Sequence, residues 1–184
     1  MGYNVVAKSL KLLILPDEDM VGVIEQNIGN ARFVWNNILS RYLELYCLFQ
    51  AHNCPLRPNI SNFNAILKML KVEFPFLREG ESTSQQQVLI DLIKAFSRFF
   101  KNISGHPNFK SKKNAHPSFR IQKNGNNIKI TNKRIKLAKL GLYTFIKQAP
   151  EYRKLLKTCT INKCGLSKEK MEKYYAIVKH IYAL

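Results

Sequence analysis

The residues best suited to chemistry in this sequence are few, and their spacing does not assemble a catalytic site. Metal-dependent phosphoryl transfer needs clustered carboxylates that hold two cations about 4 Å apart. The whole chain has three aspartates, and its basic second half has three glutamates: Asp17, Asp19, Asp91, Glu151, Glu169 and Glu172. The first two aspartates are explained by helix capping, and Asp91 has no acidic neighbour three or four positions away. We therefore expect binding rather than catalysis from this chain.

Histidines and cysteines do not complete a nucleophilic or metal site either. The histidines are His52, His106, His116 and His180, and no spacing pairs one of them with a nucleophile. Cys47, Cys54, Cys159 and Cys164 form no CxxC pair, which favours free thiols in a reducing cytosol over the alternative of a zinc site. No glycine-rich phosphate loop is present. We predict no catalytic residue, no metal and no cofactor in this chain.

The charge distribution indicates the partner. Residues 1–100 carry a net charge of about +1, residues 101–184 carry about +17, and no Asp or Glu occurs from Lys101 to Ala149. A solvated surface normally mixes both signs, so this bias favours a face that binds polyphosphate. Nucleic acid is the expected partner. A membrane surface is the weaker alternative, because the basic half shows no long amphipathic helix.

No signal peptide and no apolar run of about 20 residues is visible in the sequence. We therefore expect a cytoplasmic, nucleoid-associated protein with no membrane partner.

Hydrophobic periodicity predicts a strand and then helices in the first half. Residues 5–15 read as one strand that Pro16 ends, and Asp17 is suited to cap the helix that follows. From Met20 to Phe49 apolar residues recur every three or four positions, which is typical of an amphipathic helix. Gly29 is expected to divide this helix or kink it.

The remaining helices are predicted over residues 60–73 and from Ser82–Ser84 to about Asn102. Trp35, the only tryptophan, lies on the apolar stripe of the first helix and is interpreted as a core residue. The last helix should bury one apolar face, composed of Leu89, Leu92, Ile93, Phe96, Phe99, Phe100 and Ile103. The glutamines 85–87 in its first turns are either solvated surface or readers of base edges, since Gln can pair with adenine.

After Gly105 the apolar period changes to two, which predicts short strands. The candidates are residues 118–123, 127–131, 134–137, 142–147, 158–163 and 174–182, with a helical turn possible at 151–157. Turn signals that include Gly141, Pro150 and Gly165 separate them. Together with residues 5–15 these strands predict an α+β fold, in which a small β-barrel of antiparallel strands carries an inserted helical lobe. The expected boundaries are 1–16 and 105–184 for the barrel and 17–104 for the lobe.

Cations alternate with apolar residues along these strands. If the apolar set packs inward, the cations share the other face and form a nucleic-acid-binding surface. The cations are Arg120, Lys123, Lys129, Lys133, Arg134, Lys136 and Lys139.

Eight short segments, in order along nearly the whole chain, resemble the N-terminal half of the TnpB (OrfB) transposon proteins. They are Leu10–Pro16, Gly29–Asn36, Glu73–Leu77, Ser84–Leu89, Ala95–Phe100, Pro107–Lys113, the run from Ile128 to Gly141, and Lys173–Ile177. No single segment is decisive, and the resemblance rests on their number and order.

The resemblance implies a wedge-like β-barrel interrupted by a helical recognition lobe, as in compact RNA-guided DNA endonucleases related to type V CRISPR effectors. It implies two partners, a guide RNA derived from the transposon end and double-stranded DNA with a short motif beside the target. Carried over by position, Ser82 and Gln86 would read that motif. Residues lining the nucleic-acid channel would be Lys110, Lys112, Lys113, Arg120, Lys123 and Asn124.

In the family, a RuvC-like nuclease domain with its metal-binding carboxylates and a zinc ribbon follow the strand equivalent to residues 174–178. Because this sequence stops at Leu184, we expect a recognition half without its own nuclease. Three alternatives stay open: recognition supplied to a separately encoded nuclease domain, a DNA-binding repressor that does not cleave, and a basic ribosome-associated protein with an accidental resemblance.

Overall fold

A computed structural model describes residues 5–52, 56–113, 117–131, 134–137, 139–145, 160–169 and 173–183. The chain forms two compact units, one of residues 1–28 with 116–184 and the other of residues 29–115. The sequence placed the corresponding boundaries at 16/17 and 104/105. The predicted helical turn at 151–157 and Lys133 lie outside the described residues.

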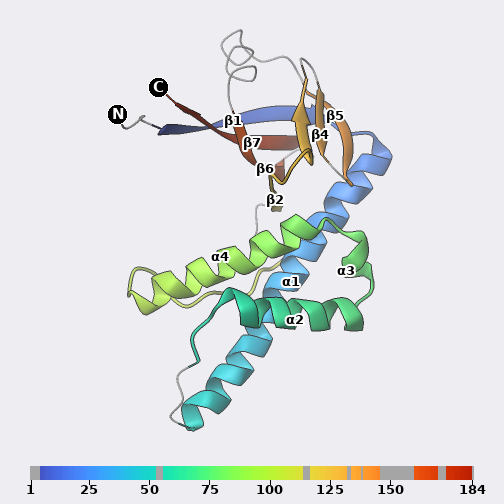
Figure 1. Cartoon of the computed structure of the whole chain (residues 1–184). Helices are drawn as coiled ribbons and strands as arrows, with labels where there is room; N and C mark the ends of the chain where they lie inside the picture. The colour runs from blue at the N-terminus through green and yellow to red at the C-terminus, as the bar shows by residue number, and fades with distance from the viewer. Residues whose placement is uncertain are drawn as a thin grey trace. The chain divides into compact units, whose positions relative to one another are not determined.

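The first unit, which we call the sheet unit, is built on seven antiparallel strands in the order β2-β6-β7-β1-β5-β4-β3. The strands are β1 (Val5–Leu15), β2 (Ser118–Gln122), β3 (Ile128–Ile130), β4 (Arg134–Leu137), β5 (Gly141–Phe145), β6 (Thr160–Glu169) and β7 (Lys173–Ala183). The long strands β1, β7 and β6 run side by side (Figure 1). The α+β class is thus confirmed, but the described strands pair as an open sheet with β2 and β3 at its edges, and closure into a barrel is not confirmed.

One predicted turn in this unit is wrong. Gly165 lies inside β6, opposite Arg120 of β2 and Ile177 of β7, rather than between strands. A Cβ at Gly165 would lie 3.5 Å from Arg120 Cγ and 4.0 Å from Ile177 Cβ, which are ordinary van der Waals distances. The strand therefore continues through this glycine without a close backbone approach.

The apolar face of the sheet packs on the first turns of helix α1 (Glu18–Ala51). Asp17 caps this helix as predicted, because its Oδ1 accepts a hydrogen bond from the Met20 N–H at 2.9 Å. Ile24 of α1 is fully buried. Gly141 has a φ of +106°, and a Cβ there would lie 3.4 Å from Met20 Cε. The turn into β5 therefore favours glycine for its backbone, whereas a Cβ there would make only an ordinary van der Waals contact with Met20.

Helix α1 continues through Gly29, so the predicted division of this helix is wrong. A glycine costs a helix about 1 kcal/mol relative to alanine. The flanking residues Ile28, Asn30 and Ala31 are all buried, so burial of this stretch outweighs that cost.

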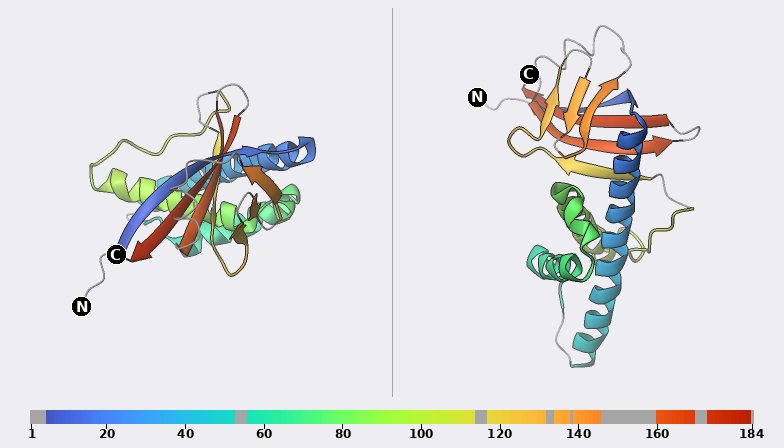
Figure 2. Two further views of the ribbon diagram at one scale, coloured as in Figure 1. Left: turned by 90° about the horizontal axis from the view of Figure 1, so that it is seen from above. Right: turned by 90° about the vertical axis from the view of Figure 1, so that its right-hand side faces the viewer.

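The second unit, which we call the helical unit, contains the rest of α1 with α2 (Ile60–Glu73), α3 (Phe76–Glu79) and α4 (Ser82–Phe100). Helices α2 and α4 lie beside the C-terminal part of α1 (Figure 2). Asn59 caps α2 by accepting a hydrogen bond from the Asn62 N–H at 2.9 Å, and α2 has the predicted bounds. The sequence did not predict the single turn of α3, which follows Pro75.

An aromatic cluster joins these helices. The Tyr42 ring of α1 lies 5.4 Å from the Phe63 ring of α2 and 4.6 Å from the Phe96 ring of α4, between centroids. All three side chains are almost completely buried. Phe100 and Ile103, however, are 48% and 62% exposed, contrary to the predicted buried face. Helix α4 ends at Phe100, so Ile103 no longer follows the helical period.

Candidate nucleic-acid interface

Strand register places cations from distant parts of the chain on one face of the sheet. Arg120 of β2 lies opposite Gly165 of β6, which lies opposite Ile177 of β7, which lies opposite Lys11 of β1. Directly opposite residues of antiparallel strands share a face. Arg120 and Lys11 therefore lie on the same side of the sheet, and both are exposed.

The short strands add their cations to the same side. Lys129 of β3 lies opposite Lys136 of β4, and Arg134 lies two residues before Lys136. Arg134 is opposite Thr144 of β5, and Thr144 is opposite Leu15 of β1. Because residues two apart in a strand share a face, Leu15 lies on the same side of the sheet as Lys11. The sheet thus brings together β3 and β4 cations with those of β1 and β2.

We call this side the cationic face and define it by seven residues: Lys11, Arg120, Lys129, Arg134, Lys136, Lys163 and Lys173. All are exposed except Lys163, which is half-buried. Among the described strand positions on this side, Glu169 is the one carboxylate, and it pairs with Lys11. Lys11 also lies over the Tyr175 ring, 4.1 Å from its centroid. Like charges directly opposite in a sheet are destabilising, so the Lys129–Lys136 pair costs stability unless an anion lies over it.

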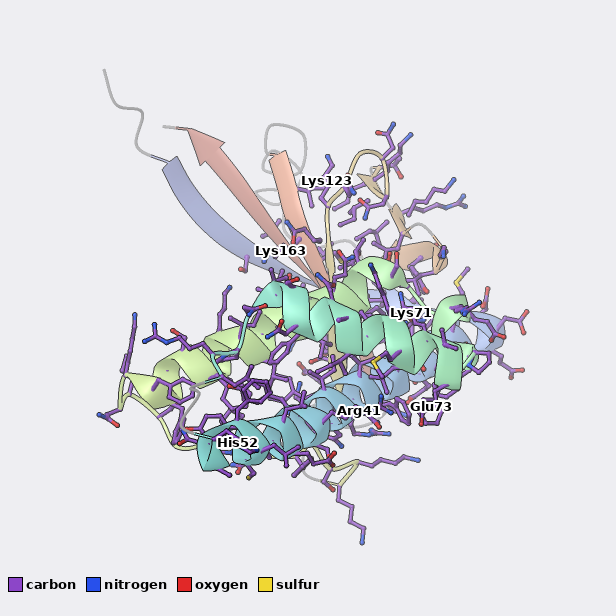
Figure 3. The ribbon with its side chains drawn as sticks, turned by 60° about the horizontal axis from the view of Figure 1, so that its bottom comes forward. Arg41, His52, Lys71, Glu73, Lys123 and Lys163 are labelled. Atoms are coloured by element: carbon purple, nitrogen blue, oxygen red, sulfur yellow. The ribbon has the colours of Figure 1, made fainter. Side chains whose placement is uncertain are left out.

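Sequence reasoning predicted four of these residues and missed the lysines of β1, β6 and β7. Lys11 could have been found, since Leu10, Leu12 and Ile14 alternate with it and are buried. Lys163 lies within the predicted strand 158–163, but its face depends on the register of β6 with β2 and β7, which spacing along the chain does not give. Lys123 and Lys163 both lie on the sheet unit in Figure 3.

Three predicted residues of the sheet unit lie in loops rather than on the strands. Lys123 and Asn124 are in the β2–β3 connection, which Asn127 closes by accepting from the Asn124 N–H at 2.8 Å and donating to the Gln122 carbonyl at 2.9 Å. Lys139 is in the β4–β5 turn, with a φ of +63°. Asn124 and Lys139 are exposed and Lys123 is half-buried, so phosphates can reach them at the edge of the sheet.

The predicted basic loop belongs to the helical unit, where α1 holds it in an extended conformation. The Asn36 side-chain amide makes two hydrogen bonds with the backbone of Lys110. Its Nδ2 donates to the Lys110 carbonyl at 3.0 Å, and its Oδ1 accepts from the Lys110 N–H at 2.8 Å. The Trp35 indole N–H donates to the Asn108 carbonyl at 2.9 Å, and Lys110 Nζ lies 4.0 Å from the centre of the Trp35 ring. Lys112 and Lys113 follow as exposed residues.

Trp35 is buried as predicted, at 8% exposure. Its role in anchoring the loop was not predictable, because its partner Asn108 lies 73 residues away.

At the start of α4 the structure distinguishes three adjacent glutamines. Gln85 is 1% exposed and donates to the Leu77 carbonyl at 2.6 Å, and Gln87 is 2% exposed and donates to Asp91 at 3.0 Å. Gln86 is exposed together with Ser82, four residues earlier, and such a pair shares one helix face. Neither of the two interpretations, solvated surface or base-edge reading, holds for the buried Gln85 and Gln87, and both stay open for Gln86.

Titratable groups inside the two units have structural roles. Burial raises the pKa of the Cys164 thiol to about 12, and burial with the nearby Tyr46 raises the pKa of Tyr42 to about 12. On the apolar side of the sheet, Glu25 accepts hydrogen bonds from Lys168 Nζ at 2.7 Å and from the Tyr174 hydroxyl at 2.9 Å. These bonds link α1 to β6 and β7.

Within the described ranges, no group of three or more His, Cys, Asp or Glu side chains could hold a metal ion. A separate ion pair joins Arg41 of α1 to Glu73 of α2, and the two residues lie together in Figure 3. No described helix is long and apolar enough to span a bilayer.

No protein-family model matches this sequence, and no curated protein matches it. The resemblance to TnpB proteins therefore rests on the sequence segments named above.

Proposed function

We propose that this protein binds nucleic acid, with the phosphate backbone lying on the cationic face of the sheet. The observation that carries this proposal is the register that gathers seven cations on one side with a single carboxylate among its described strand positions. A polyphosphate chain is the anion that binds most favourably to such a set of cations, because each neutralised phosphate releases a condensed counterion. Like charges that lie directly opposite one another, such as Lys129 and Lys136, gain most from it.

The proposal is tested by replacing Arg120, Lys129 and Lys136 with Gln together and measuring affinity for a DNA duplex at several salt concentrations. Each lost phosphate contact should reduce the salt slope by about 0.9, so the triple variant should have a slope shallower by roughly two to three units. All three residues are exposed, so folding, monitored by circular dichroism, should be unchanged.

A matched control removes three exposed cations of the helical unit, Lys68, Lys94 and Arg98. If net charge alone drives binding, the control triple will change the slope as much as the sheet triple does. That result, or an unchanged slope in the sheet triple, would show that the cationic face is not the phosphate site.

We further propose, from the resemblance to TnpB proteins, that the ligands are a transposon-derived guide RNA and duplex DNA, and that the sheet is part of a wedge-like barrel. Ser82 and Gln86 would read a short DNA motif, since both are exposed on one face at the start of α4. Expression in a host that carries the transposon end, followed by sequencing of co-purified nucleic acid, tests this identity. Enrichment of one structured RNA supports it, and bulk RNA without enrichment contradicts it.

A further inference from the structure

A pocket of about 600 Å³ opens in the helical unit, at the end of α1 that His52 marks in Figure 3. Its walls come from three segments: Tyr46 and Gln50 in the last turns of α1, Arg57 in the segment before α2, and Ser97 and Phe100 in α4. The volume lies within the ~300–1,000 Å³ of small-molecule sites and exceeds what an inorganic ion needs.

Aromatic rings form two of these walls and are held in place. Phe100 is 48% exposed, and its inner side packs nearly parallel to the Phe96 ring, with an interplanar angle of 23° and centroids 6.2 Å apart. Tyr46 lies against Tyr42, with centroids 6.1 Å apart, and its hydroxyl accepts a hydrogen bond from Gln50 Nε2 at 2.7 Å. A ring that is supported on one side and open on the other is a platform for stacking.

The polar groups of the pocket distinguish between ligands. Gln50 and Lys101 lie at the C-terminal ends of α1 and α4, where the helix dipole places partial negative charge. This charge disfavours an anion inside the pocket and suits a neutral ligand. Arg57 and Lys101 are exposed, and the described residues that line the pocket include no carboxylate. A neutral planar ring inside and phosphates at the rim satisfy both conditions.

We propose that this pocket binds one unstacked nucleobase of a single-stranded nucleic acid, stacked on Phe100, with the flanking phosphates on Arg57 and Lys101. This inference deepens the proposed function and rests on it, but it assigns a second site in the other unit. The cationic face supplies sequence-independent affinity, and the pocket adds a preference for an accessible base.

The test compares two single-stranded DNA hexamers, one fully abasic and one with a single central adenine among abasic sites. The full chain should bind the adenine hexamer roughly 5- to 100-fold more tightly, which is the range that one stacked base supplies. In Phe100→Leu, which keeps an apolar side chain but removes the ring, the ratio should fall to near one while affinity for the abasic hexamer is unchanged. Lys68→Gln, an exposed cation outside the pocket, should leave the ratio unaltered.

The outcomes separate this inference from the proposed function. Replacing Arg120, Lys129 and Lys136 with Gln should weaken the abasic hexamer, whereas the adenine hexamer keeps its binding in the pocket, so the ratio should not fall. A ratio of one in the unmodified chain, or a ratio that Phe100→Leu does not change, overturns the pocket assignment while the cationic face stands. If neither hexamer binds, millimolar adenosine monophosphate becomes the probe of the pocket, and the duplex titration alone decides the proposed function. Nuclear magnetic resonance shifts at Phe100 that Arg57→Gln weakens would then support the pocket, and their absence would overturn it.

Discussion

Substitution of Asn36 tests whether α1 holds the basic loop as the hydrogen bonds indicate. Asn36→Ala removes both hydrogen bonds to the Lys110 backbone, at 3.0 Å and 2.8 Å. Each such bond contributes about 0.5–1.5 kcal/mol net, and these two are exposed to water, so we expect a loss of about 1–2 kcal/mol of local stability. The Trp35–Asn108 hydrogen bond remains, so the helical unit should stay folded.

The assay is limited trypsin digestion with mass spectrometry, because the loop offers cleavage after Lys110, Lys112 and Lys113. When opening is fast relative to cleavage, the rate follows the population of the open form. A loss of about 1–2 kcal/mol then predicts cleavage about 5- to 30-fold faster at these three sites.

Asn37→Ala is the matched control, since the Asn37 side chain bonds only within α1 to the Phe33 carbonyl, at 3.0 Å, among the contacts described for it. It should leave loop cleavage within about twofold of the unmodified chain. Equal cleavage rates in the Asn36 and Asn37 variants would refute the reasoning, because the loop would then be held by something other than the two-way amide contact.

The remaining predictions concern two buried residues, Cys164 and Gln85, and the exposed Gln86. The folded chain keeps the Cys164 thiol protonated, with its pKa raised by burial from 9.0 to about 12, whereas the unfolded chain loses that proton above pH 9. The folded state therefore binds more protons in this range, and the free energy of unfolding should fall by roughly 1 kcal/mol between pH 8 and pH 10. Urea titrations at the two pH values measure this loss, which should be much smaller in Cys164→Ala. Gln85→Ala should lower the free energy of unfolding by about 1–3 kcal/mol, because the buried Leu77 carbonyl loses its donor. Gln86→Ala, at an exposed neighbour, should change the free energy of unfolding by less than about 0.5 kcal/mol. It should reduce only the preference for one DNA motif. An equal loss of affinity for every DNA sequence would contradict direct readout.

The sequence by itself determined most of the local structure. The bounds of β1, α2 and β4 agree with the predicted ranges, because apolar period, capping residues and prolines are local signals. Asp17 is the clearest case, since it caps α1 through a side chain only three residues from its partner. The charge bias of the second half was likewise readable without any structure.

Only the tertiary structure decided which of these residues act together. Strand order places β1 between β7 and β5, so a lysine near the N-terminus joins cations encoded more than 100 residues later. Among the adjacent glutamines, the sequence could not decide which are buried, because that depends on which face of α4 meets α3 and the preceding loop. Asn36 carried no signal, since its partner lies 74 residues away. Local energies select helix or strand, but register and burial are set by contacts between distant segments, whose energies cannot be read from spacing along the chain.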